Sequence, residues 1–130
     1  MQKRKSKEPN SFHVWAPDIE EWPETWMRGE EDLDYGRKLL PYFKEFLLYL
    51  YEEGLARKTF GQYRDNLWLL GGTIISSVSF SEEYQEDPLC TLIASVEGDS
   101  ILPDHYGQMS EAELRAFERM CRRFEKYLQR

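Results

Sequence analysis

Histidine and cysteine are scarce in this sequence, with two of each among 130 residues. His13 and His105 lie far apart, whereas the common metal sites of proteins need three or four ligands with at least one closely spaced pair. Neither cysteine stands in a sequence pattern that activates a thiol. The sequence therefore predicts no metal site, no cofactor and no nucleophilic cysteine.

Other features that carry function are missing as well. No glycine loop has the spacing that cradles phosphate groups, and Gly71 and Gly72 fit neither nucleotide-binding motif. Paired acidic residues such as Glu20 and Glu21 are common on solvated surfaces and do not by themselves define a catalytic pair. We expect a protein that is not an enzyme, and the sequence identifies no small-molecule substrate.

No apolar run approaches the roughly 20 residues that span a membrane, and the basic N-terminus lacks the apolar core of a signal peptide. We expect a soluble, cytoplasmic protein with no membrane partner.

Cys90 and Cys121 stand among apolar neighbours, and both are predicted to be buried, reduced thiols. The length, with 41% hydrophobic residues, fits one domain with its own core.

Acidic residues outnumber basic ones by 24 to 17, and the excess lies in two blocks. Residues 18–34 carry eight acids and one base, and residues 82–104 carry seven acids and no base. Residues 57–65 and 110–130 are mildly basic. An acidic protein repels the phosphate backbone overall, which counts against general nucleic-acid binding.

Residues 1–11 contain four bases and are predicted to form a disordered basic tail. Residues 12–31 carry Trp15, Trp22 and Trp26 among two prolines, and neither helical nor strand periodicity holds there. Because proline imposes extended or turn geometry, we expect an extended N-terminal arm. Its tryptophans either pack on the body of the same chain or dock on another subunit.

Apolar side chains at helical spacing predict a helical bundle over residues 32–130. The first helix is expected to begin near Asp32 and to end at Gly54, a natural left-handed C-terminal residue. Pro41 lies in its middle and either kinks this helix or splits it in two.

The second helix is expected after a short turn, with Thr59 as its N-cap. It ends near Leu70 or continues to about Phe80, because Gly71 and Gly72 together weaken a helix interior by about 2 kcal/mol relative to alanine. A break in the helix, or close contact with a neighbouring helix, would explain two glycines here.

Two further helices are predicted after a polar connection. Pro88 starts a short apolar helix over residues 88–96, for which a buried strand is the alternative, and Gly98 stops it. Ser110 and Glu113 form a capping box, from which the last helix runs to the C-terminus. The segments together predict an all-α fold, one small bundle of four to five helices.

The turn between the two central helices carries a wider pattern. An apolar helix leads to a Gly-Leu turn, a basic residue with threonine, and then tyrosine and leucine at steps of four. The matching positions are Leu50, Gly54, Leu55, Lys58, Thr59, Tyr63 and Leu67. Over roughly residues 42–70 this resembles the N-terminal core-binding domain of tyrosine recombinases (phage integrases), which implies a SAM-like bundle. The chain has no room for the catalytic domain of that family.

In that family the turn and the start of the second helix approach the DNA backbone. The resemblance therefore implies contact with phosphate by Arg57, Lys58, Thr59 and Arg64. The whole chain also resembles short bacterial proteins of unknown function that share a core of the type KT…NLWLLGG, a resemblance that implies no activity.

Two hypotheses of function follow. In the first, the chain is a bacterial interaction module that binds a partner protein or a second copy of itself through residues 15–34, with Trp15, Trp22 and Trp26 as contacts. In the second, it is a DNA-binding module that uses the turn from Gly54 to Thr59 together with the arginines of the last helix. One continuous basic face would favour the second hypothesis, and a divided one would weaken it.

Overall fold

The computed structural model describes residues 9–79, 87–98, 101–104 and 106–130. Within these ranges every regular element is a helix, which confirms the prediction of an all-α bundle. In chain order they are α1 (Pro9–Trp15), the 3₁₀ helix η2 (Ile19–Glu21), α2 (Trp22–Trp26), α3 (Glu30–Glu52), α4 (Arg57–Val78), α5 (Pro88–Val96), the 3₁₀ helix η4 (Tyr106–Gln108) and α6 (Glu111–Gln129). The predicted basic tail falls largely outside the described residues, as does most of the predicted polar connection before α5.

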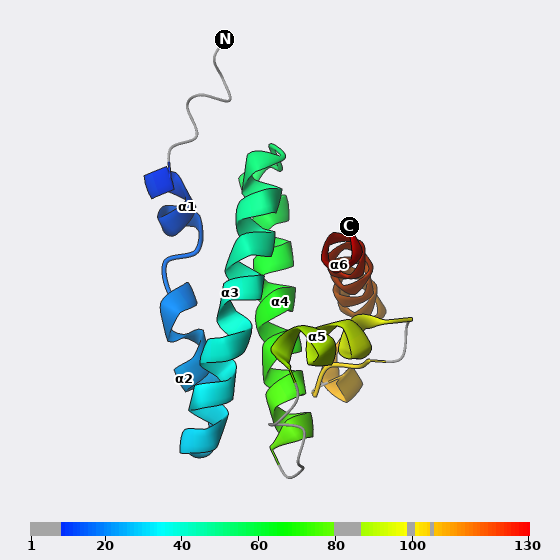
Figure 1. Ribbon diagram of the computed structural model, residues 1–130. Helices are drawn as coiled ribbons and strands as arrows, with labels where there is room; N and C mark the ends of the chain where they lie inside the picture. The colour runs from blue at the N-terminus through cyan, green and yellow to red at the C-terminus, as the bar shows by residue number, and fades with distance from the viewer. Residues whose placement is uncertain (1–8, 80–86, 99–100, 105) are drawn as a thin grey trace.

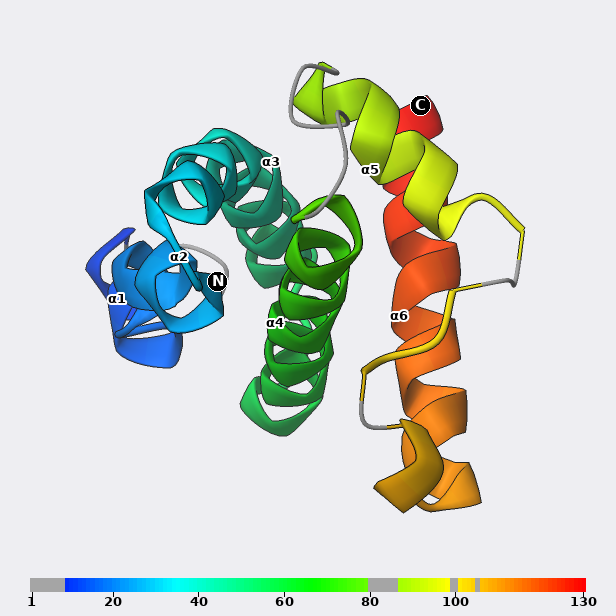
Figure 2. The ribbon, with the colours of Figure 1, turned by 90° about the horizontal axis from the view of Figure 1, so that it is seen from below.

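Helices α3 and α4 form an antiparallel hairpin at the centre of the molecule (Figure 1). Gly54 in the turn has a φ of 91°, the left-handed conformation expected of a residue that ends a helix. The N-terminal helices α1 and α2 lie on one side of the hairpin and α6 lies on the other, with α5 crossing between α3 and α6 (Figure 2). Within the described residues no helix is both long and apolar enough to cross a membrane.

Aromatic side chains form the centre of the core. Phe43 and Phe46 of α3 are fully buried against Phe124 of α6, with ring centroids 5.7 and 4.8 Å apart. Trp26 of α2 meets Phe43 edge-on at 5.8 Å. Burying rings of this size supplies much of the free energy that stabilises a small domain.

Helix α3 passes through Pro41 as one element, so the proline does not split it. A proline in a helix interior costs about 3 kcal/mol through a lost hydrogen bond and a steric clash. Leu39, Leu40 and Phe43 beside it are all buried, whereas Pro41 itself faces solvent. Packing of these neighbours on both sides of the proline therefore outweighs the local cost.

The N-terminal segment differs from the expected extended arm. Its described residues form three short helical pieces: α1, then a bend at Ala16 to Asp18, then η2 followed directly by α2. The prolines that exclude one long helix still permit short ones, because Pro23 stands in the first turn of α2, where no N–H is needed. The segment packs on α3 and α4 of its own chain, burying Phe12 and Ile19.

Helix α4 begins at Arg57, with Ala56 rather than Thr59 in the N-cap position. It continues through Gly71 and Gly72 because the Trp26 indole lies against them. A Cβ atom built on Gly71 would lie 2.2 Å from Cζ2 of Trp26, far closer than any real contact. The close approach expected at these glycines exists, but its partner is a tryptophan ring of α2.

The last two helices follow the expected local signals. Residues 88–96 form α5 and not a strand, and Gly98 after it has a φ of 73°. The capping box of α6 is present, with Glu113 N donating to Ser110 Oγ at 3.1 Å and Ser110 N donating to Glu113 Oε1 at 2.8 Å. These two elements were predictable because their start and stop signals are local.

Candidate partner-binding groove

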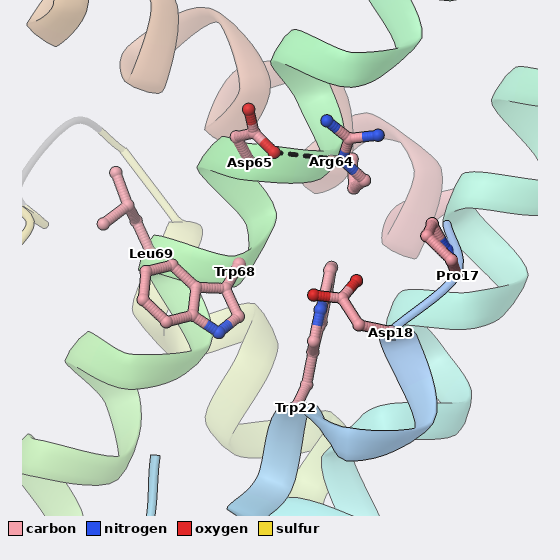
Figure 3. Close-up of a pocket in the computed structure, with 7 residues that line it drawn as sticks. All are labelled: Pro17, Asp18, Trp22, Arg64, Asp65, Trp68 and Leu69. Atoms are coloured by element: carbon pink, nitrogen blue, oxygen red, sulfur yellow. Dashed lines mark hydrogen bonds and ion pairs between the residues drawn. The ribbon is translucent and has the colours of Figure 1, made fainter. Parts of the chain in front are cut away.

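A groove of about 760 Å³ lies between the N-terminal segment and α4 (Figure 3). We call it the Trp68 groove. Its lining residues are Pro17, Asp18, Trp22, Arg64, Asp65, Trp68 and Leu69. Apolar surface dominates the lining, and two carboxylates and one guanidinium stand among it. Such a mixture, apolar with a few polar groups, is typical of sites that bind ligands or peptide side chains.

Trp68 is 38% exposed, although it is held at both ends by α2. Its indole Nε1 donates a hydrogen bond to Thr25 Oγ1 at 2.9 Å, and Thr25 Oγ1 donates in turn to the carbonyl oxygen of Trp22 at 2.7 Å. The backbone carbonyl of Trp68 accepts a hydrogen bond from Trp26 Nε1 at 3.1 Å. The indole is therefore fixed in position while part of its surface remains open to solvent.

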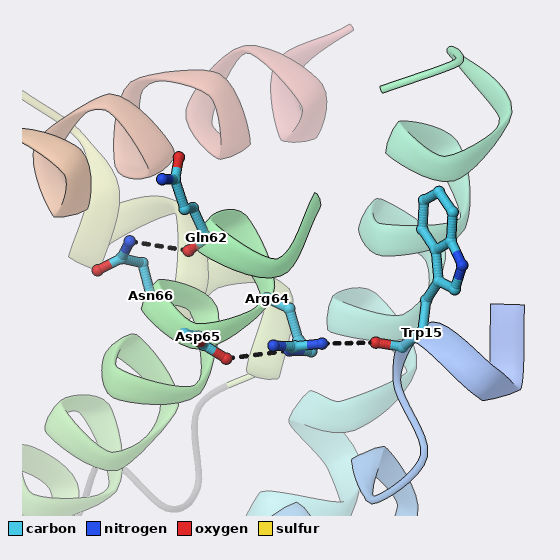
Figure 4. A network of polar contacts seen from close by, with 5 residues as sticks. All are labelled: Trp15, Gln62, Arg64, Asp65 and Asn66. Atoms are coloured by element: carbon cyan, nitrogen blue, oxygen red, sulfur yellow. Dashed lines mark hydrogen bonds and ion pairs between the residues drawn. The ribbon is translucent and has the colours of Figure 1, made fainter. Parts of the chain in front are cut away.

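Arg64 forms the other end of the groove and is also held in place (Figure 4). Its Nη1 donates to the carbonyl oxygen of Trp15 at 2.7 Å, and its Nε pairs with Asp65 Oδ1 at 3.0 Å. Asp18 on the opposite wall is exposed, and within the described residues it has no ion-pair partner. In the groove, the carboxylate of Asp65 is therefore neutralised by Arg64, whereas that of Asp18 is not.

The three tryptophans predicted as partner contacts all pack against other parts of their own chain. Trp22 is 3% and Trp26 is 7% exposed. Trp15 is half-buried, with its ring 5.0 Å from Tyr51 and 5.2 Å from Phe60. Of the two alternatives for these rings, the structure shows packing within the chain. Of these three tryptophans, only Trp22 lines the Trp68 groove.

Trp68 was not among the site residues predicted from the sequence. The signal was present, because Trp68 lies one position beyond Leu67 in a helix whose buried positions include Tyr63, Leu67 and Leu70. A tryptophan turned about 100° away from a leucine that faces the core lies at the edge of the buried face. The fold then decides whether a neighbouring element covers that edge, and here α2 covers it only in part.

The four residues predicted to contact DNA divide into two pairs. Arg64 is held by Trp15 and Asp65, and the Arg57 guanidinium lies 5.8 Å from the centroid of the Trp15 ring. Lys58 and Thr59 are exposed, and their side chains have no hydrogen-bond or ion-pair partner among the described residues. Nucleic-acid binding at this turn stays a prediction, with two of its four side chains already engaged by the N-terminal segment.

The basic face proposed for this hypothesis is divided. Arg57 and Arg64 contact the N-terminal segment, whereas Arg123 of α6 stacks on Tyr63 at 5.6 Å, and α6 lies on the other side of α4 (Figure 2). The acidic Asp65 stands next to Arg64 on α4. The basic groups near the turn and those of α6 therefore form two separate surfaces.

The two cysteines lie in different environments. Cys121 is buried as predicted, and burial, with smaller contributions from Glu118 and Glu125, raises the pKa of its thiol to about 12. Cys90 on α5 is exposed, so the prediction that it is buried was wrong. The nine-residue α5 leaves part of its circumference to solvent, and Cys90 falls on that part.

Metal binding finds no support in the residues that the structure describes, where no group of three or more His, Cys, Asp or Glu side chains converges. His13 is exposed, and His105 lies outside the described residues.

Comparisons with protein-family models, curated proteins and solved structures gave no match to this chain. The proposed function therefore depends on the residues of the groove.

Proposed function

We propose that this chain is a non-enzymatic binding module that takes a segment of a partner protein into the Trp68 groove. The observation that supports it most is a tryptophan that stays 38% exposed beside a largely apolar groove of about 760 Å³. Tryptophan is one of the residues that dominate binding free energy at protein interfaces. Because hydrogen bonds with α2 already orient Trp68, little conformational entropy is lost when a partner binds.

The charges around the groove indicate which segment fits. Asp18 has no counterion within the described residues, and residues 18–34 together carry eight acids and one base. Opposite charge across an interface raises the association rate and selects the partner. We therefore propose an occupant with one aromatic or aliphatic anchor residue next to lysine or arginine.

A random peptide library displayed on phage and selected on the immobilised full chain tests this proposal. We expect the enriched peptides to share an apolar anchor beside a basic residue. A selected peptide should lose about tenfold or more in affinity for Trp68→Ala, because removal of a central tryptophan at an interface costs at least about 1.4 kcal/mol. Isothermal titration calorimetry measures the affinity, and urea unfolding verifies that the variant is folded.

Leu48→Ala is the matched control. Leu48 is 39% exposed, almost the same as Trp68, but it belongs to α3 and does not line the groove. Asp18→Asn should weaken binding of the same peptides and reduce its dependence on salt. The proposal fails if no peptide is enriched, or if Trp68→Ala binds the selected peptides as tightly as the unmodified chain.

A second copy of the chain is the competing occupant. Specific interfaces bury about 1,000 Å² or more in total, so self-association through this face would be visible as a dimer in analytical ultracentrifugation. A dimer that Trp68→Ala dissociates would assign the groove to self-association in place of a different partner. A chain that stays monomeric over a wide range of concentrations would leave the partner segment as the occupant.

A further inference from the structure

Basic residues of the C-terminal segment line a second pocket. Helix α6, which carries most of them, lies on the opposite side of α4 from the N-terminal helices (Figure 2). This pocket, which we call the α6 basic pocket, has a volume of about 600 Å³. Three tyrosines and five basic residues from three helices line it. They include Tyr49 of α3, Tyr63 of α4, and Arg119, Arg123 and Lys126 of α6. Within the described residues, no aspartate or glutamate side chain lines the pocket.

The positive charge of this pocket is largely uncompensated. Arg122 is neutralised by Glu118 at 3.2 Å and Glu125 at 2.9 Å. Arg119, Arg123 and Lys126, in contrast, have no ion-pair partner among the described residues. Three cations that converge without counterions repel one another, and a bound anion would relieve that repulsion.

Residues 110–130 contain six basic residues, and five of them line this pocket. The sixth, Arg115, pairs with Glu111 at 3.5 Å one turn earlier on the same helix. The concentration of charge is therefore a property of one face of α6 and not of the helix as a whole.

Tyrosine rings hold two of the guanidinium groups in place. Arg123 lies 5.6 Å from the ring centroid of Tyr63, which is only 9% exposed, and Arg130 lies 5.1 Å from Tyr49 and 4.3 Å from Tyr127. Cation–π contacts orient a guanidinium without neutralising it. The planar forks of both arginines thus remain available for an anion with several oxygens, and phosphate matches that geometry.

We propose that the α6 basic pocket binds the phosphate groups of a nucleotide. Its volume lies within the range of about 300 to 1,000 Å³ that small-molecule sites occupy, and aromatic rings with arginine planes are the surfaces on which bases stack. The nucleotide is either free or part of a single strand, since both present the same phosphate and base. The net charge of −7 disfavours the long backbone contact that duplex DNA would make.

Three probes test this inference on the full chain at about 50 mM salt, where phosphate contacts are strong. ADP and inorganic pyrophosphate are titrated by calorimetry, and a fluorescein-labelled oligothymidylate of about ten nucleotides by anisotropy. We expect saturable binding of at least one nucleotide probe. Stronger binding of ADP than of the oligonucleotide assigns a free nucleotide, and the reverse assigns a single strand.

Arg119→Gln/Arg123→Gln should weaken that binding about tenfold or more, while Arg115→Gln on the same helix leaves it unchanged. Lys126→Gln is a second variant, with a smaller expected loss, in case the double variant unfolds. Absence of saturable binding for all three probes would overturn the proposal. It would also be overturned if Arg119→Gln/Arg123→Gln and Arg115→Gln bound the nucleotide probe equally well, or if pyrophosphate alone bound and no nucleotide did.

Discussion

Asp32 is the one charged residue in the described core, at 3% exposure, and it ties the start of α3 to the end of α4. Its Oδ2 accepts a hydrogen bond from the backbone N–H of Arg28 at 2.8 Å, and its Oδ1 accepts one from Ser79 Oγ at 3.1 Å. A carboxylate in the first turn is also stabilised by the helix dipole. Through this side chain the first turn of α3 is linked to Ser79, which lies 47 residues further along the chain.

Asp32→Ala should lower the free energy of unfolding by about 1–3 kcal/mol, because it leaves the Arg28 N–H without its acceptor. Asp34→Ala, two residues on, is the control. Asp34 is exposed and makes only a 3.8 Å surface pair with Lys38, so its removal should change stability by less than about 0.5 kcal/mol. Urea unfolding monitored by tryptophan fluorescence measures both, and equal losses in the two variants would contradict this role.

Cys121 and Cys90 should differ in reactivity. With its pKa raised to about 12 from an ordinary 9.0, the buried Cys121 thiol stays protonated in the folded chain at pH 9, whereas half of such thiols ionise in the unfolded chain. We expect a thiol reagent to label Cys90 quickly at this pH and Cys121 only after unfolding. Equal labelling rates in the folded protein would show that Cys121 is accessible.

The same shift predicts the pH dependence of stability. The folded pKa lies above the unfolded one, so the contribution of Cys121 is fully present below pH 9 and is lost as the pH rises from 9 towards 12. Unfolding curves at increasing pH should therefore show a decline that is smaller in Cys121→Ala than in the unmodified chain.

At the scale of the element, α4 depends on the fit between its paired glycines and Trp26. A methyl group on Gly71 would lie 2.2 Å from the indole, whereas one on Gly72 would lie 3.3 Å from Cδ1 at the edge of the ring. The two adjacent glycines therefore differ in role. Gly71 makes room for the ring, and Gly72 has only a tight contact beside it.

Gly71→Ala should destabilise the protein by about 1–3 kcal/mol, since the ring must move out of a packed interior. Gly72→Ala should change stability by about 1 kcal/mol or less, because alanine favours the helix while the neighbouring ring shifts slightly. In a Trp26→Ala background the Gly71→Ala substitution should no longer destabilise. Chemical denaturation of the four variants measures the coupling, and similar effects of the two glycine substitutions would contradict the assignment.

At the scale of the whole molecule, α4 separates two surfaces of opposite character. The Trp68 groove is apolar with a free carboxylate, and the α6 basic pocket carries cations without counterions. Among the residues that the structure describes, none lines both. Trp68→Ala therefore serves as a control in the nucleotide titrations, and Arg119→Gln/Arg123→Gln serves as one in the peptide titrations, so failure of one proposal leaves the other standing.

Most of the helices could be predicted from local signals. The capping box at Ser110 and the stop at Gly98 depend on residues within one turn, and the structure shows both. The prediction of Thr59 as the N-cap of α4 was wrong, because the N-cap is Ala56. Alanine has no side chain that could cap a helix, so no residue type in the sequence indicates this start. Helix α1 and the 3₁₀ helix η2 were missed because pieces of three to seven residues are too short to show periodicity.

By itself the sequence determined the helical class, the α3–α4 hairpin with its glycine turn, and the basic character of α6, since these depend on spacing along the chain. Only the tertiary structure decided which tryptophans are covered, that Gly71 receives the ring of Trp26, and that the arginines near the turn and those of α6 lie on opposite sides of α4. The physical reason is that periodicity assigns a residue to a face of its helix, whereas docking of other helices decides what covers that face.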